Sequence, residues 1–181
     1  MNICVFGAAS DRLDSAYFTL AEDLGRAMAR RGHRLIFGGG ATGLMGAAAR
    51  GILAEGGSYT GVAPRFFDIP GILVEQGEMI FTDTMAERKT IMRQHAEAFI
   101  ALPGGIGTYE EFLETLTLRQ LGRHEKPIAL LEAQGYYEPM EAMLQHTVRS
   151  GFMGAECLDM YRLFSDAEAC LNWLEETGRH E

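Results

Sequence analysis

Short apolar segments alternate with helical segments along almost the whole chain, and this alternation limits the fold more than any other feature. Short apolar runs predict strands at residues 2–6, 34–37, 59–63, 78–82, 98–102 and 127–131, with a further short element near 160–164. Apolar residues at helical spacing predict helices at 14–31, 84–97, 108–121, 137–150 and 166–176, and one after Gly46 that reaches Leu53 or Ala54. Repeated strand–helix units form parallel sheets, so the sequence predicts an α/β protein.

This pattern is typical of a Rossmann-like, doubly wound fold, in which a parallel sheet carries helices on both faces. No repeat, linker or low-complexity segment interrupts the 181 residues, so we expect a single domain over residues 1–181. In such sheets, ligands bind beyond the carboxyl ends of the strands, where the strand order reverses. Functional residues are therefore expected in the loops that lead from a strand into a helix.

Composition and charge exclude several classes of function. The formal net charge of −9 and the lack of a basic run argue against binding to a nucleic acid polymer. No stretch approaches the roughly 20 apolar residues of a membrane span, and the first residues do not resemble a signal peptide, so we expect a cytoplasmic protein without a membrane partner. The cysteines Cys4, Cys157 and Cys170 are widely spaced, which indicates buried free thiols rather than a zinc site or disulfides.

Two glycine-rich loops follow predicted strands, GGGATGLMG at residues 38–46 and PGGIGTYEE at residues 103–111. Glycine lets a ligand approach the backbone closely, and the start of the following helix adds free N–H donors and a positive dipole end. Each loop could therefore hold an anion, although a tight turn with close helix packing is the structural alternative. Neither G-x-G-x-x-G after the first strand nor GxxxxGK[ST] occurs, so the sequence supports neither NAD binding nor a P-loop kinase.

The second loop carries candidate catalytic carboxylates. Thr108 and Glu111 have the T-x-x-E spacing of a capping box, and a glutamate that reaches back to its cap is less free to meet a substrate. Glu110 beside it is an equal candidate, so the residues alone leave the functional carboxylate open. An ionised carboxylate near a helix start suits a general base, or stabilises the oxocarbenium-like transition state of glycoside cleavage.

Two adjacent basic residues, Arg88 and Lys89, lie in the helix that precedes the strand before the second loop. Both cannot face the core, and a solvated helix face is the ordinary interpretation of such a pair. The functional alternative turns Arg88 inward, where its planar guanidinium can bind phosphate or ribose oxygens in pairs.

Three ordered motifs, GGGATGLMG, MAERKTIM and LPGGIGTYEEF, resemble the Lonely Guy (LOG) family. The family pattern PGGxGTxxE is matched from Pro103 to Glu111, and the similarity runs from Phe6 to about Trp173. Members of this family are cytokinin riboside 5′-monophosphate phosphoribohydrolases, and many bacterial relatives were long labelled possible lysine decarboxylases. The resemblance implies a Rossmann-like fold and a homodimer with active sites near the interface. The apolar residues Leu113, Leu116 and Leu121 are compatible with such an interface.

The resemblance also implies roles for individual residues. It makes Arg88 and Glu111 the catalytic pair. Its implied nucleotide contacts, together with the neighbours that we include as substrate-binding candidates, are Lys89, Gly104, Gly105, Ile106, Gly107, Thr108, Tyr109, Glu110, Thr117, Gly40, Gly43, Met85 and Ser10. The chain departs from the family at Ala86, where His is common, at Leu118, where Trp is frequent, and at the FGAAS segment 6–10, where Cys-Gly-Ser-Ser is usual. These departures bear on the preference for the base.

We therefore expect hydrolysis at ribose C1′ of AMP or an N6-prenylated AMP, which releases free base and ribose 5-phosphate. No ligand cluster is visible, so we expect neither a metal nor an organic cofactor. One rival is a nucleotide-binding protein without turnover, against which the Arg88 and Glu111 pair argues. The other is decarboxylation of an amino acid, which normally uses pyridoxal phosphate on a lysine. The chain has only Lys89 and Lys126, one after Arg88 and one before Pro127.

Overall fold

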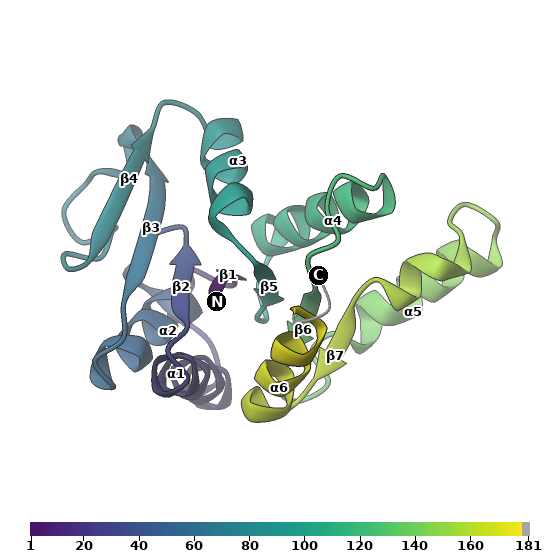
Figure 1. The fold of residues 1–181 in the computed structure, drawn as a ribbon, viewed down its shortest axis with the longest axis horizontal. Helices are drawn as coiled ribbons and strands as arrows, with labels where there is room; N and C mark the ends of the chain where they lie inside the picture. The colour runs from purple at the N-terminus through teal and green to yellow at the C-terminus, as the bar shows by residue number, and fades with distance from the viewer. Residues whose placement is uncertain (179–181) are drawn as a thin grey trace.

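A computed structural model describes residues 1–178, and their strands form one parallel sheet of seven strands in the order β4-β3-β2-β1-β5-β6-β7 (Figure 1). The strands are β1 (Asn2–Phe6), β2 (Arg34–Phe37), β3 (Tyr59–Pro64), β4 (Glu78–Thr82), β5 (Ala98–Ala101), β6 (Ile128–Leu131) and β7 (Arg162–Phe164). Every predicted strand is present with bounds within one or two residues of the expected ones. The α/β fold class predicted from the alternation is therefore confirmed.

Helices cover both faces of this sheet, as the doubly wound pattern predicts. The helices are α1 (Ser15–Arg30), α2 (Gly43–Ala54), α3 (Met85–His95), α4 (Ile106–Gln120), α5 (Glu138–Arg149) and α6 (Ala167–Gly178). One face carries α1, α2 and α6, and the other carries α3, α4 and α5 (Figure 1). Two short 3-10 helices, Arg65–Phe67 and Ala155–Asp159, were not predicted from the sequence.

The alternation of side chains along β1 divides the core into two halves. Ile3 and Val5 pack with α1, α2 and α6, whereas Cys4 and Phe6 pack on the face of α3, α4 and α5. Successive side chains of a strand point to opposite faces, so a strand buried on both sides reads as an unbroken apolar run. The three cysteines are buried and unpaired, as predicted. Within residues 1–178, no helix is long and apolar enough to span a membrane.

The strand order reverses between β1 and β5, the central neighbours of the sheet. From β1 the chain steps outward through β2 and β3 to β4, and it then returns to the other side of β1 with β5. The loops after β1 and β5 consequently start side by side, and the Ala8 N–H donates to the Pro103 carbonyl at 3.0 Å. This is the place in an open parallel sheet where a ligand site is expected.

Two helix starts differ from the predicted ones. Helix α2 begins at Gly43 rather than after Gly46, because Gly43 adopts a left-handed φ of 62° and turns the chain directly into the helix. Helix α4 begins at Ile106 rather than Thr108, because Gly105 is extended and serves as its N-cap. Each glycine loop is therefore shorter than expected, and its last residues already belong to the helix.

Candidate active site

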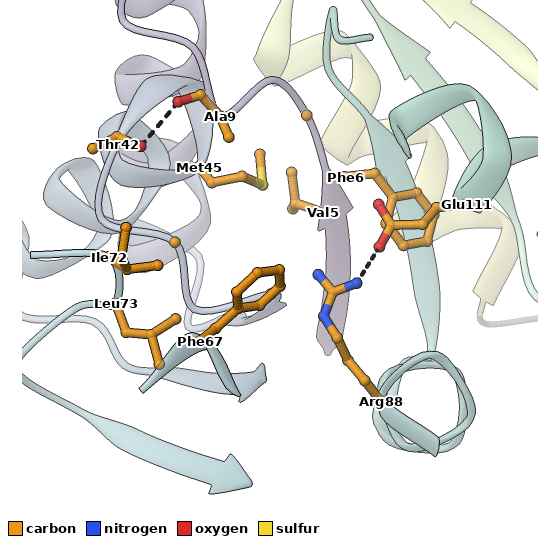
Figure 2. Close-up of a pocket in the computed structure, with 13 residues that line it drawn as sticks. Val5, Phe6, Ala9, Thr42, Met45, Phe67, Ile72, Leu73, Arg88 and Glu111 are labelled. Atoms are coloured by element: carbon orange, nitrogen blue, oxygen red, sulfur yellow. Dashed lines mark hydrogen bonds and ion pairs between the residues drawn. The ribbon is translucent and has the colours of Figure 1, made fainter. Parts of the chain in front are cut away.

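An ion pair between helices α3 and α4 lies at the switch point. Arg88 Nη1 donates to Glu111 Oε1 at 2.8 Å (Figure 2). Arg88 Nε donates to the Val62 carbonyl at 3.0 Å. Both charged side chains are only 13% exposed. The solvated-face interpretation of Arg88 is therefore wrong, because its guanidinium points inward toward the end of the sheet.

Glu111 has an altered affinity for protons. Burial raises its carboxyl pKa above the ordinary value, whereas the charge and hydrogen bond of Arg88 act to lower it, and burial has the larger effect. A carboxylate held beside a cation in a poorly solvated place is suited to exchanging a proton or to facing a developing positive charge. The pair is therefore a candidate for catalytic chemistry.

The capping-box interpretation of Thr108 and Glu111 is also wrong. Gly105 is the N-cap of α4, so Thr108 lies inside the first turn, where it is buried. Glu111 cannot reach back to a cap that lies six residues earlier, and it bonds to Arg88 across the interhelical gap instead. Of the two candidate carboxylates, Glu110 is the more exposed and pairs with Lys89.

Gly38 at the end of β2 makes room for the guanidinium. A Cβ at this position would lie 3.1 Å from Arg88 Cζ and would overlap Nη2. The first glycine of the 38–46 loop is thus required by the close approach of an arginine from α3, about 50 residues later in the chain. Its role in the structure is to admit a side chain, and the sequence motif alone did not reveal this.

A mostly apolar cavity of about 290 Å³ lies on one side of the ion pair (Figure 2). Its walls include Phe67, Ile72 and Leu73 from the segment between β3 and β4, together with Met45 from α2. Sequence reasoning missed all four. The available signal was the run of apolar residues in the irregular stretch 64–77, where Phe67 and Ile72 remain 40% and 45% exposed.

A second cavity, of about 320 Å³, lies on the other side of the ion pair, and its walls are richer in backbone. Gly105, Gly107 and Thr108 from the start of α4 line it, and so do Met85 and Glu110. Gly7, Ala9, Arg88 and Glu111 line both cavities, so the ion pair lies at their junction.

The two glycine loops differ in the donors that remain at their helix starts. At the start of α2, Gly43 N–H donates to Asp11 Oδ1 at 2.8 Å and Leu44 N–H donates to the Ala8 carbonyl at 2.8 Å. A carboxylate already occupies this helix start, so the expectation that the first loop holds an anion there is wrong. The Gly105 cap of α4 provides no side-chain acceptor, and the first N–H groups of a helix have no partner within it. The second loop is therefore the better candidate for an anion site of the two.

The other predicted contacts fall into two groups. Gly40 lines the apolar cavity, and Lys89 lies beside the pair with bonds to Glu110 and Glu114. Seven predicted residues line neither of the two cavities at the ion pair in the described chain: Ser10, Gly43, Lys89, Gly104, Ile106, Tyr109 and Thr117. Gly104 and Tyr109 lie behind the loop, whereas Ile106 is 89% exposed and the Thr117 hydroxyl donates to its own helix.

Among residues 1–178, no three or more His, Cys, Asp or Glu side chains come together as a metal site. The two lysines are engaged elsewhere: Lys89 pairs with glutamates, and Lys126 Nζ donates to the Arg93 carbonyl at 2.8 Å. Neither lines the two cavities at the ion pair. The site chemistry is accordingly that of an arginine, a carboxylate and a helix start.

The sheet order and the glycine-lined switch point define the class, an α/β protein of the Rossmann type. A molybdenum cofactor binding protein from Rippkaea orientalis has the same fold, with a TM-score of 0.74, 20% identity, and coverage of 97% of this chain and 96% of that chain. A Moco carrier protein from Chlamydomonas reinhardtii is similar, with a TM-score of 0.73, 20% identity, and coverage of 99% and 98%. At this identity the likeness concerns the fold alone.

The sequence comparisons identify the family. The family model described as "Possible lysine decarboxylase" matches residues 45–174. A cytokinin riboside 5′-monophosphate phosphoribohydrolase of Rhodococcoides fascians is 41% identical over 154 residues, 84% of this chain and 78% of that protein. One from Arabidopsis thaliana is 37% identical over 177 residues, 96% of this chain and 81% of that protein. The chain belongs to this family, and the resemblance to the LOG proteins is confirmed.

Replacement of Gly38 by alanine should displace the Arg88 guanidinium without unfolding the protein, because the end of a long side chain can move. Gly40→Ala is the matched control, since the nearest atom to a Cβ there is Met45 Cβ at 3.9 Å. We expect the Nε–H NMR signal of Arg88, held by the Val62 carbonyl, to shift or broaden in Gly38→Ala and to persist in Gly40→Ala. An unchanged Arg88 signal in both variants would contradict the proposed contact.

Proposed function

We propose that this protein hydrolyses the N-glycosidic bond of a nucleoside 5′-monophosphate and releases free base and ribose 5-phosphate. The observation that carries the proposal is the Arg88–Glu111 pair at the junction of an apolar and a backbone-lined cavity. A nucleotide is likewise divided into an apolar and a polar part: the base is at one end, the phosphate is at the other, and C1′ lies between them. The substrate is AMP or an N6-prenylated AMP, in keeping with the names of the relatives.

The two ends of the nucleotide occupy different cavities. The 5′-phosphate binds at the start of α4, where the backbone of Gly105, Gly107 and Thr108 and the helix dipole favour an anion. The base lies among Met45, Phe67 and the neighbouring apolar side chains. The ribose then spans the ion pair, so C1′ lies near Glu111.

Arg88 and Glu111 divide the chemistry between them. Arg88 orients the nucleotide through its hydroxyl or phosphate oxygens, for which a planar guanidinium is well shaped. Glu111 accepts a proton from the attacking water, or stabilises the positive charge that develops on the ribose as the bond to the base breaks. Water supplies the hydroxyl at C1′, and the departing base takes up a proton.

Incubation with AMP and an assay for adenine separate this proposal from its two rivals. A nucleotide-binding protein without turnover would bind AMP and release no adenine. An amino-acid decarboxylase would release carbon dioxide from an amino acid in the presence of pyridoxal phosphate, for which either Lys89 or Lys126 would have to leave its present partners. Adenine release supports the hydrolase.

Glu111→Gln should abolish release of the base while AMP binding remains. The amide keeps the shape of the side chain but can neither accept the proton nor face a cation with a full charge. Kinetics of adenine release and calorimetric binding of AMP measure the two effects, and thermal unfolding reports the fold. Near-full hydrolysis by the variant would remove Glu111 from the mechanism.

Arg88→Ala should reduce kcat/KM by roughly tenfold to more than a hundredfold, because it removes a charge-assisted contact worth ~1.5–3 kcal/mol. Lysine should rescue poorly, since an ammonium cannot reproduce a two-pronged contact. Lys89→Ala is the control and should be milder, because its ammonium pairs with Glu110 and Glu114 rather than with Glu111. Equal small losses in both alanine variants would contradict a role for Arg88.

We further propose that the protein is a cytoplasmic homodimer. Of the leucines expected at an interface, Leu116 is buried in the core of its own chain, whereas Leu121 is 64% exposed. The exposed Ile106 and Leu121 lie at the two ends of α4, the helix that carries Glu111, so a partner that covers this helix would lie beside the site. Light scattering at micromolar concentration should give twice the mass of the 19.9 kDa chain, and a monomer mass would overturn the proposal.

A further inference from the structure

Three successive carbonyl oxygens of the loop after β5 are held by donors from other parts of the chain. The Tyr137 hydroxyl donates to the Leu102 carbonyl at 2.7 Å, and the Ala8 N–H donates to the Pro103 carbonyl at 3.0 Å. The Tyr136 hydroxyl donates to the Gly104 carbonyl. A carbonyl oxygen that faced a phosphate would repel it, and in this loop each of the three oxygens already has a donor.

The hydrogen bond from Tyr136 to the Gly104 carbonyl also sets the direction of the next backbone donor, the Gly105 N–H. In a trans peptide the carbonyl and the following N–H point in opposite directions. A hydroxyl that keeps the Gly104 carbonyl on the side of Tyr136 therefore turns the Gly105 N–H to the other side. Gly105 lines the cavity at the start of α4, whereas Tyr136 does not. The contact of Tyr136 thus acts on the wall of the anion cavity from behind it.

The proton of the Tyr136 hydroxyl has a defined direction. The Tyr109 hydroxyl donates to the Tyr136 oxygen at 3.3 Å, so the single proton of Tyr136 goes to Gly104. Burial raises the pKa of Tyr136 to about 12, which keeps this donor protonated at neutral pH. The ring is fixed by edge contacts with Tyr17 and Tyr137, whose centroids lie 6.0 and 5.1 Å away.

We propose that Tyr136 is a positioning residue for the nucleotide phosphate: its hydroxyl orients the Gly104–Gly105 peptide so that the loop presents N–H groups, and not a carbonyl, to the anion. The inference rests on the proposed function, in which the start of α4 holds the 5′-phosphate. Tyr137 has a different task. Its hydroxyl donates to the Leu102 carbonyl, and the next residue is Pro103. Because proline has no backbone N–H, this hydrogen bond orients no donor toward the anion.

Tyr136→Phe tests the proposal, because it removes the hydroxyl and keeps the ring contacts. The measurements are calorimetric affinities for inorganic phosphate and ribose 5-phosphate, and steady-state kinetics with AMP. We expect both anions to bind about two- to tenfold more weakly, as for the loss of one hydrogen bond. KM for AMP should rise by a similar factor while kcat changes little, because the phosphate contact is the same in the ground and transition states.

Two matched variants separate positioning from stability. Tyr161→Phe removes another tyrosine hydroxyl, which donates to Glu141 Oε1 of α5 at 2.6 Å. Neither residue lines the cavity at the start of α4, so this variant should leave both affinities unchanged. Tyr137→Phe should lower the unfolding temperature more than Tyr136→Phe does, since its hydroxyl is fully buried, and should weaken anion binding less.

Equal anion affinities for Tyr136→Phe and the wild type would overturn the proposal and leave Tyr136 a packing residue. Failure of the wild type to bind either anion would also overturn it, because the loop would then be no anion site. Failure of the proposed function is a separate result: a wild-type protein that binds ribose 5-phosphate but releases no adenine would disprove hydrolysis. The effect of Tyr136→Phe on anion affinity would still decide the positioning role.

Discussion

The ion pair between Arg88 and Glu111 is the interaction on which the organisation of this site depends. Both groups lie in a poorly solvated place, and their contact with each other replaces part of the water that each has lost. The pair therefore constrains the spacing of α3 and α4 and the backbone beside them. Gly38 has no Cβ because the guanidinium lies against it, and the Val62 carbonyl accepts the remaining Nε–H. One arginine thus contacts the backbone at the end of β2 and in β3.

The polarity of the two cavities follows from how the strand ends are covered. On the side of β2 and β3, the segment between β3 and β4 folds back and supplies Phe67, Ile72 and Leu73. On the side of β5, the chain turns at once into α4 and leaves backbone donors and a positive helix end. Asp11 neutralises the competing helix start of α2. A ligand with one apolar and one anionic end fits this division in one orientation only.

Tyr136 and Tyr137 constrain the backbone of the second glycine loop through hydrogen bonds to its carbonyls. A glycine-rich loop can adopt many conformations, and its peptide planes must be held if their N–H groups are to face an anion. Three carbonyls in a row are held by Tyr136 and Tyr137, which lie outside the cavity, and by Ala8, which lines it. The Gly104 position is also crowded by Thr108, which restricts the loop further. The loop is therefore ordered before a ligand arrives.

The sequence alone determined the fold class, the strands to within two residues and the two glycine loops, because alternation and glycine content are local properties of the chain. It also marked Arg88 and Glu111 through the family motifs. Only the tertiary structure decided where these two side chains lie and what they contact. Thr108 and Glu111 have the spacing of a capping box, yet the helix starts two residues earlier. Which helix start keeps free donors, and where the apolar wall comes from, depend on contacts between residues far apart in sequence, and no local pattern records them.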